Sequence, residues 1–175
     1  MDKKEIEERL GMPLMTMSSP FGWLCSIEKF GSDWEKAELE ALKQLELQCD
    51  CDALIFAGMV MIDGVLRLYV VPNAHPLDVL VPCEVGAPRN GRTAEDKERC
   101  HAELRRVYDI IPFRPYGVGP AEYKCVFNRD VSNLEASQID DILTEGLEGY
   151  ASEMEDSWDL AQRILLDNGL KLWWG

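Results

Sequence analysis

Two runs of β-forming residues on either side of an Asp-Gly pair constrain the fold of this chain more than any other feature. The first run covers 53–62, the second covers 65–71, and Asp63-Gly64 separates them. Asp and Gly tolerate the positive φ angles of a type I′ turn, which matches the twist of two antiparallel strands. The sequence therefore predicts a β-hairpin whose second strand ends at Pro72.

Amphipathic segments predict three main helices, over 33–48, 94–110 and 134–166. Each carries apolar residues at intervals of three and four, and Ser or Thr stands near each start as a candidate cap. Asn168-Gly169 is typical of a helix end and closes the third. Gly146 and Gly149 weaken the middle of this third segment and leave open its division into two helices. Shorter β-rich runs predict further strands near 78–82, 123–127 and 170–174.

These elements together predict the fold class. We expect an α+β protein with an antiparallel sheet of about four to five strands, built on the central hairpin and covered by about three main helices. Residues 111–120 contain three Pro and two Gly and are expected to form a rigid loop. At 175 residues, the chain predicts a single globular domain over 1–175.

The negative charge of the chain is concentrated in one place. Between Asp130 and Ala161, which we call the acidic segment, ten residues are Asp or Glu and none is Lys, Arg or His. The formal net charge is -14 at pH 7, so this segment supplies most of it. Phosphate groups repel such a chain, which argues against direct binding to nucleic acid or to an anionic membrane.

Helical spacing places the carboxylates of the acidic segment on one side of its predicted helix. Apolar residues from Ile139 to Leu165 recur every three or four positions and predict a buried stripe. The carboxylates recur with the same spacing on the opposite side, toward water. The candidate partner-binding residues are Asp141, Glu145, Glu148, Asp156 and Asp159.

The absence of Lys, Arg and His from the acidic segment favours a cationic partner. Like charges at helical spacing cost roughly 0.2–0.5 kcal/mol per pair, and ordinary helices offset this cost with interleaved Lys and Arg. We therefore expect a non-enzymatic protein whose acidic face docks on a basic protein surface. Its sharpest form is a nucleic-acid-mimicking inhibitor of the anti-restriction or anti-CRISPR type, carried by a mobile genetic element. Ordinary solubility is the alternative explanation of the acidic residues.

Two absences predict a cytoplasmic location. The first residues, MDKKEIEERLG, are charged and lack the apolar run and cleavage site of a secretory signal. The most apolar stretch, 53–71, is interrupted by Asp63-Gly64 and by Arg67, so no transmembrane helix is expected. The six Cys are then expected to be reduced thiols.

Two alternative functions use residues outside the acidic segment. Asp109, Glu122 and Lys124 would form a metal-dependent nuclease site, in which two carboxylates hold Mg²⁺ and the Lys positions the attacking water. An oligomeric structural protein would instead use an apolar interface that includes Trp173 and Trp174. The oligomeric state itself is left open by the sequence.

One group of soft ligands suggests a zinc site. It consists of Cys49, Cys51, Cys100 and His101. The spacing departs from that of structural zinc sites, which pair their cysteines across two to four residues. Cys is also a common buried apolar residue. We therefore expect packing, with no metal and no cofactor.

Overall fold

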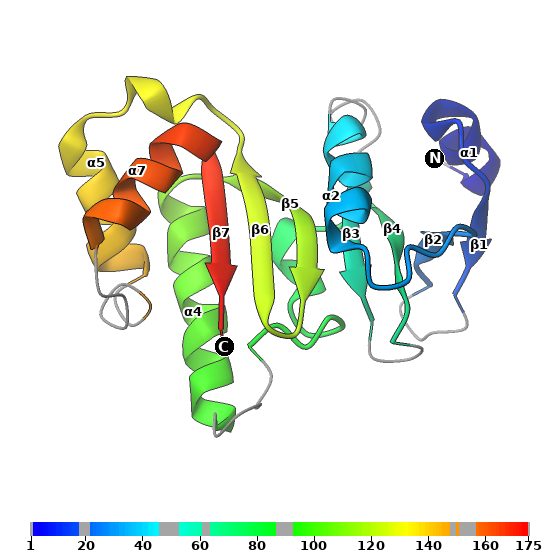
Figure 1. The fold of residues 1–175 in the computed structure, drawn as a ribbon, viewed down its shortest axis with the longest axis horizontal. Coiled ribbons are helices and arrows are strands. Elements are labelled where there is room, and N and C mark those ends of the chain that lie inside the picture. The colour runs from blue at the N-terminus through cyan, green and yellow to red at the C-terminus, as the bar shows by residue number, and fades with distance from the viewer. Residues whose placement is uncertain are drawn as a thin grey trace. The chain divides into compact units, whose positions relative to one another are not determined.

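A computed structural model describes residues 2–17, 22–45, 53–60, 64–86, 93–147, 150 and 157–174 (Figure 1). The chain divides into two compact units. The first unit comprises 1–84 with 115–119, and the second comprises 85–114 with 120–175. The single domain expected from the length stays a prediction. Within the described ranges, no helix combines the length and the apolar character needed to cross a membrane.

The predicted hairpin forms the centre of the first unit. Strands β3 (Ala53–Met59) and β4 (Leu66–Pro72) pair antiparallel, from Ala53 opposite Pro72 to Met59 opposite Leu66. Gly64 lies in the connection with a φ of 61°, a conformation that favours Gly. The hairpin is thus confirmed, but its connection is longer than the predicted Asp63-Gly64 pair, because Val60, Gly64 and Val65 also lie outside the strands. Asp63 lies outside the described residues.

Two short strands extend this sheet. Strand β2 (Leu24–Ser26) pairs antiparallel with β4, and β1 (Leu14–Thr16) pairs antiparallel with β2. Neither strand was predicted, because three residues carry too little alternation to form a pattern.

Helix α1 (Lys3–Leu10) packs on one face of the strands. The Asp2 side chain accepts a hydrogen bond from the backbone N–H of Glu5 at 2.9 Å and caps the helix. The helix and the strands share one cluster of buried side chains, formed by Ile6, Leu10, Leu14, Leu24, Ala53, Ile55 and Val70. This cluster holds α1 on the sheet face that carries Ile55 and Val70.

Helix α2 (Trp34–Lys43) packs on β3 and β4. Its start is capped by Asp33, whose side chain accepts a hydrogen bond from the Lys36 backbone N–H at 3.0 Å. The buried positions of the helix are Ala37 and Ala41, both 0% exposed. Small side chains at these positions let the helix approach the sheet closely.

The strand predicted over 78–82 is wrong. Pro76–Val79 form a 3₁₀ helix, η1, and turns follow it. The Nδ1 atom of His75 accepts from the Leu77 N–H at 3.2 Å, and the Asp78 carboxylate accepts from the His75 N–H at 2.8 Å. These reciprocal caps, with Pro76 in the first helical position, outcompete the weak β pattern.

The second unit is built on one antiparallel strand pair and one long helix. Strands β6 (Glu122–Phe127) and β7 (Gly169–Trp173) pair with Lys124 opposite Lys171, as two of the predicted strands. Helix α4 (Ala94–Ile110) has the predicted bounds, and Thr93 and Asp96 close its start with reciprocal hydrogen bonds. Figure 1 shows the helices of this unit gathered beside β6 and β7.

The helix predicted over 134–166 is interrupted. After a short 3₁₀ turn, η2 (Val131–Asn133), helix α5 (Ala136–Asp141) continues into a π-helical turn, η3 (Ile142–Gly146). Helix α7 (Ser157–Asp167) follows beyond residues that the structure does not describe. Helices thus form near both ends of the predicted span, and the described break at Leu147 follows Gly146, where the sequence left a division into two helices open.

The predicted antiparallel sheet of four to five strands with three main helices is wrong. The described strands form a seven-stranded mixed sheet in the order β1-β2-β4-β3-β5-β6-β7, accompanied by five described α-helices, so the fold remains α+β. The mixed character comes from β5 (Phe113–Gly119), which replaces the predicted loop and pairs parallel with β3 through Gly117 and Val118. Pro115 lacks a backbone N–H, but it precedes both paired residues and therefore does not interrupt this pairing.

Candidate functional site

The described part of the acidic segment presents its carboxylates to water. Asp140, Asp141 and Glu145 are exposed, and we call these three residues the acidic face. On the opposite side of α5 and η3, the apolar side chains are buried, namely Ile139, Ile142, Leu143 and Leu147. The predicted division into a buried stripe and an outward acidic side holds for these residues.

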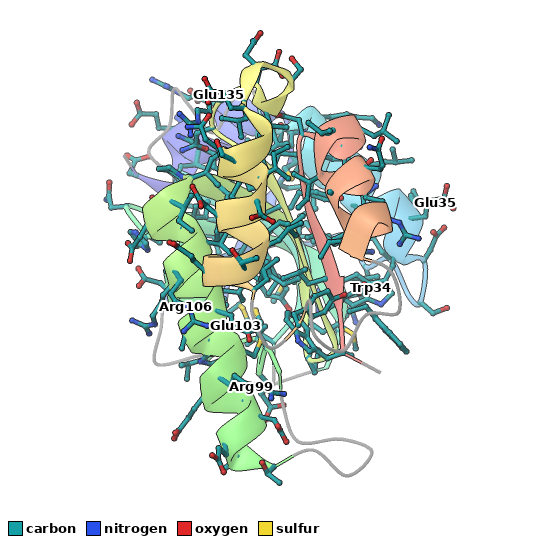
Figure 2. All side chains as sticks on the ribbon, turned by 90° about the vertical axis from the view of Figure 1, so that its left-hand side faces the viewer. Trp34, Glu35, Arg99, Glu103, Arg106 and Glu135 are labelled. Carbon is teal, nitrogen blue, oxygen red and sulfur yellow. The ribbon has the colours of Figure 1, made fainter. Side chains whose placement is uncertain are left out.

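Close packing against α4 fixes the acidic face in place. A Cβ atom on Gly146 would lie 2.6 Å from Cγ2 of Val107, so only Gly allows η3 to come this near to α4. The Nε atom of Arg106 also donates a hydrogen bond to the backbone carbonyl of Glu145 at 2.8 Å. Figure 2 shows α5 running beside α4, with Arg106 on α4 and Glu135 at the start of α5. The two helical segments therefore support each other.

The carboxylates of the acidic face make no ion pair with any described Lys, Arg or His. Arg106 bonds the Glu145 backbone, not its carboxylate. Helix α1 shows the contrast, because Lys3 and Lys4 pair with acids one turn away at 3.6 and 3.8 Å. The carboxylates of the acidic face are thus not held in ion pairs by described residues.

Three of the five candidate partner-binding residues cannot be placed on this face. Glu148 and Asp156 lie outside the described residues, and the side chain of Asp159 does too, although its backbone belongs to α7. Asp141 and Glu145 are brought to one side of η3 and α5. Their role in binding stays a prediction.

The nuclease alternative finds only two of its three residues together. Lys124 Nζ lies 3.0 Å from Glu122 Oε2, because residues two apart on β6 share a sheet face. Tyr123 points to the other face, where its ring packs on Phe113 and Phe113 packs on Tyr108 of α4. Asp109, which is exposed on α4, is not brought to the Glu122–Lys124 pair.

The residues proposed for zinc are not assembled in the described chain. Cys49 and Cys51 lie outside the described residues. Cys100 is buried, and His101 Nε2 lies 2.8 Å from the backbone carbonyl oxygen of Val85. Among the described residues, no group of three or more His, Cys, Asp or Glu is placed to hold a metal ion.

The C-terminal tryptophans differ in their surroundings. Trp174 is 7% exposed and packs edge to face on the Tyr150 ring, whereas Trp173 is 66% exposed on β7. Trp174 thus anchors the end of the chain on the second unit. A role for Trp173 in an oligomer interface stays a prediction.

Acidification is expected to destabilise the protein through His101. Burial, with Lys97 and Arg105 nearby, lowers the pKa of His101 in the folded state, although its bond to Val85 opposes this shift. The unfolded chain therefore binds a proton first, so the contribution of His101 is complete above about pH 6.5 and is lost as the pH falls through the folded pKa. Urea unfolding should show a steeper loss of stability below about pH 6.5 for the wild type than for His101→Gln. Parallel pH profiles would contradict this assignment.

Comparison with protein-family models, with curated proteins and with solved structures finds no match for this chain. Function must therefore be argued from the arrangement of the residues themselves. Among the arrangements predicted from the sequence, the acidic face is both assembled and open to solvent in the described chain.

Proposed function

We propose that this protein is a non-enzymatic binding protein whose acidic face docks on a basic surface of another protein. The observation that carries the proposal is the exposure of Asp140, Asp141 and Glu145 without an ion pair to any described residue. The structure also describes α4, where Arg99 pairs with Asp96 at 3.3 Å. Basic residues thus alternate with acidic ones on α4, whereas the neighbouring α5 and η3 contain none.

A cationic partner accounts for this omission in physical terms. Asp141 and Glu145 stand four residues apart, a spacing at which like charges on a helix repel each other by roughly 0.2–0.5 kcal/mol. A partner with Lys or Arg converts that repulsion into attraction. Complementary charge also steers association and accelerates it at low salt. Ordinary solubility requires exposed charge as well, but it does not require that both signs be segregated.

In its most specific form, the proposal is that this protein mimics nucleic acid. The carboxylates of the acidic face would present negative charge to the groove in which a nucleic-acid-processing protein holds phosphates. The partner would then lose its nucleic acid when it binds this chain. Inhibition by occupancy is the expected consequence, and no chemical step on this chain is needed.

Capture followed by competition tests this function. The full chain is immobilised and exposed at low salt to a nuclease-treated extract of the cells that carry its gene. We expect it to retain a nucleic-acid-binding protein, which is then purified and loaded with a fluorescent duplex. Added wild-type chain should release the duplex, as measured by fluorescence anisotropy.

The control for this experiment is a variant with Asp140, Asp141 and Glu145 changed to Lys. The proposal requires that this variant neither retain the partner nor release the duplex. If the variant retained the same proteins as the wild type, the acidic face would not be the docking surface. If the retained protein released no duplex, docking would stand but mimicry would not.

A further inference from the structure

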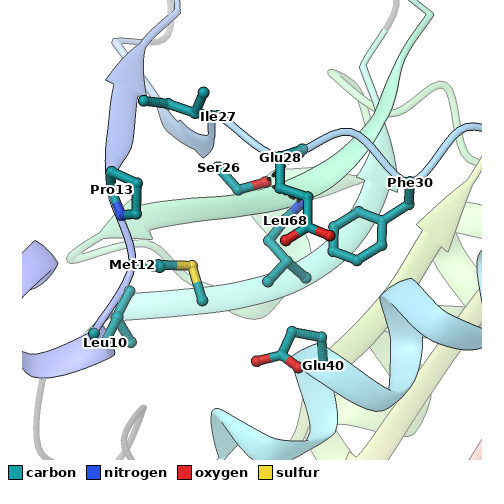
Figure 3. Close-up of a pocket in the computed structure, with 10 residues that line it drawn as sticks. Leu10, Met12, Pro13, Ser26, Ile27, Glu28, Phe30, Glu40 and Leu68 are labelled. Carbon is teal, nitrogen blue, oxygen red and sulfur yellow. Dashed lines mark hydrogen bonds between the residues drawn. The ribbon is translucent and has the colours of Figure 1, made fainter.

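A pocket of about 600 Å³ lies in the first unit, on the sheet face that carries α1 and α2 (Figure 3). Its lining includes Leu10 at the end of α1, Met12, Phe30 and Leu68 of β4. Leu68, Leu10 and Phe30 are 1%, 6% and 8% exposed, so the interior is largely apolar. A pocket of this size suits a small organic molecule.

The charged groups of the lining are two carboxylates. Glu28 follows β2, Glu40 belongs to α2, and Figure 3 shows both carboxylates turned toward the hollow. The described residues that line the pocket include no Lys, Arg or His. The hydrogen bond that Lys43 donates is the main cause of a lowered pKa at Glu40, so this carboxylate is charged at neutral pH.

Each carboxylate has a lysine neighbour that stands outside the lining. Lys36 Nζ lies 3.1 Å from Glu28 Oε1 and 5.4 Å from the centroid of the Phe30 ring. Lys43 Nζ lies 3.0 Å from Glu40 Oε2. The two lysines are 62% and 69% exposed, and such surface pairs contribute only about 0–1 kcal/mol. A ligand can therefore compete for the carboxylates.

The surroundings of Lys36 indicate which chemical group can bind at the mouth of the pocket. Its ammonium group lies near both a carboxylate and the face of an aromatic ring, which is a favourable environment for an organic cation. A ligand with its own cation could reproduce these contacts from inside the pocket. An anion would be repelled there, and a neutral ligand would gain nothing from Glu28 or Glu40.

We propose that this pocket binds a small organic cation, with an ammonium or guanidinium head between Glu28 and Glu40 and an apolar body against Leu10, Met12 and Leu68. Met12 adapts to the shape of the body because its thioether side chain is flexible. The proposal is independent of protein docking, since the pocket belongs to the first unit and the acidic face belongs to the second.

Three probes that share one apolar body and differ in their head group test which head group the pocket prefers. The full chain is titrated by calorimetry with 3-phenylpropylammonium, 3-phenylpropan-1-ol and 3-phenylpropanoate at neutral pH. We expect the ammonium to bind at least about tenfold more tightly than the alcohol, and the carboxylate to bind more weakly than both. Equal affinity for the alcohol would identify a neutral apolar site and overturn the proposal. Absence of saturable ammonium binding up to about 10 mM would overturn it as well.

Matched variants locate the binding in this pocket. Changing both Glu28 and Glu40 to Gln should reduce the preference for ammonium over alcohol to within about twofold. Glu35→Gln removes an equivalent charge from α2, where Glu35 points into solvent (Figure 2), and should leave the preference unchanged. Lys36→Met should tighten ammonium binding, because it releases Glu28. An equal loss in Glu35→Gln, or weaker binding in Lys36→Met, would contradict the proposed site.

Discussion

Replacement of Gly169 by Ala should lower the free energy of unfolding by about 3 kcal/mol or more. Gly169 lies in β7 opposite Val126, and a Cβ atom there would overlap the backbone carbonyl oxygen of Cys125 in β6. A backbone oxygen cannot turn aside as a flexible side chain can, so the two strands must separate. Urea unfolding followed by tryptophan fluorescence measures the loss.

Gly31→Ala is the control for this substitution. Gly31 has a φ of 62°, and a Cβ atom there would meet no other atom within 4 Å, so the cost of the substitution is conformational only. A left-handed Ala costs about 1–2 kcal/mol. If Gly169→Ala were no more destabilising than Gly31→Ala, the register of β6 and β7 would be wrong.

The second large effect concerns binding. Changing Asp140, Asp141 and Glu145 to Lys should weaken binding to a basic partner by at least about a hundredfold, which corresponds to about 2.8 kcal/mol. The reason is that three attractions across the interface become three repulsions, which are costly when water is excluded. Titration calorimetry at low salt with the captured partner measures this change.

The fold is expected to survive this triple substitution. The three side chains are exposed and make no ion pair with a described residue, so no described contact is lost. The matched control changes Glu95, Glu98 and Asp109, which are exposed on α4, to Lys. This control alters the net charge equally, and its affinity should fall far less. Equal weakening in both variants would mean that net charge, and not the acidic face, drives binding.

The hairpin and α4 were predictable because their signals are local. An Asp-Gly pair between β runs, and Thr93 followed three residues later by Asp96, act within one turn of the chain. Strand β5 could not be predicted, because its Pro and Gly residues are typical of a loop. Its pairing with β3 through Gly117 and Val118 favours the extended conformation, and the residues that meet there are far apart in sequence.

The Asn168-Gly169 pair was recognised correctly as a helix end, but the need for Gly at position 169 has a different cause. The sequence assigns Asn168-Gly169 to the end of a helix, and α7 does end at Asp167. However, Asn168 takes the left-handed conformation, with a φ of 48°. Gly169 is needed for another reason, namely the close approach of its Cα to Cys125 in β6. The spacing of residues along a sequence does not reveal where two strands approach too closely for a side chain larger than that of Gly.

The acidic face was predictable in part. Helical periodicity indicated the outward direction of Asp141 and Glu145, since the buried stripe on the other side is strong. The absence of ion pairs to described residues could not be predicted, because it depends on which bases the fold brings near. Glu28 and Glu40 were missed altogether, because no motif links them. Only the packing of α2 on β4 brings Glu40 to the pocket that Glu28, which follows β2, also lines.

The salt dependence of binding tests the central claim most directly, since the claim is that open carboxylates of the acidic face attract a basic surface. The affinity of the captured partner is measured between about 50 and 300 mM NaCl for the wild type and for the acidic-face triple variant. We predict that the wild type loses affinity at least about tenfold over this range, while the variant shows no such loss. A wild-type affinity that is the same at both salt concentrations would contradict the claim.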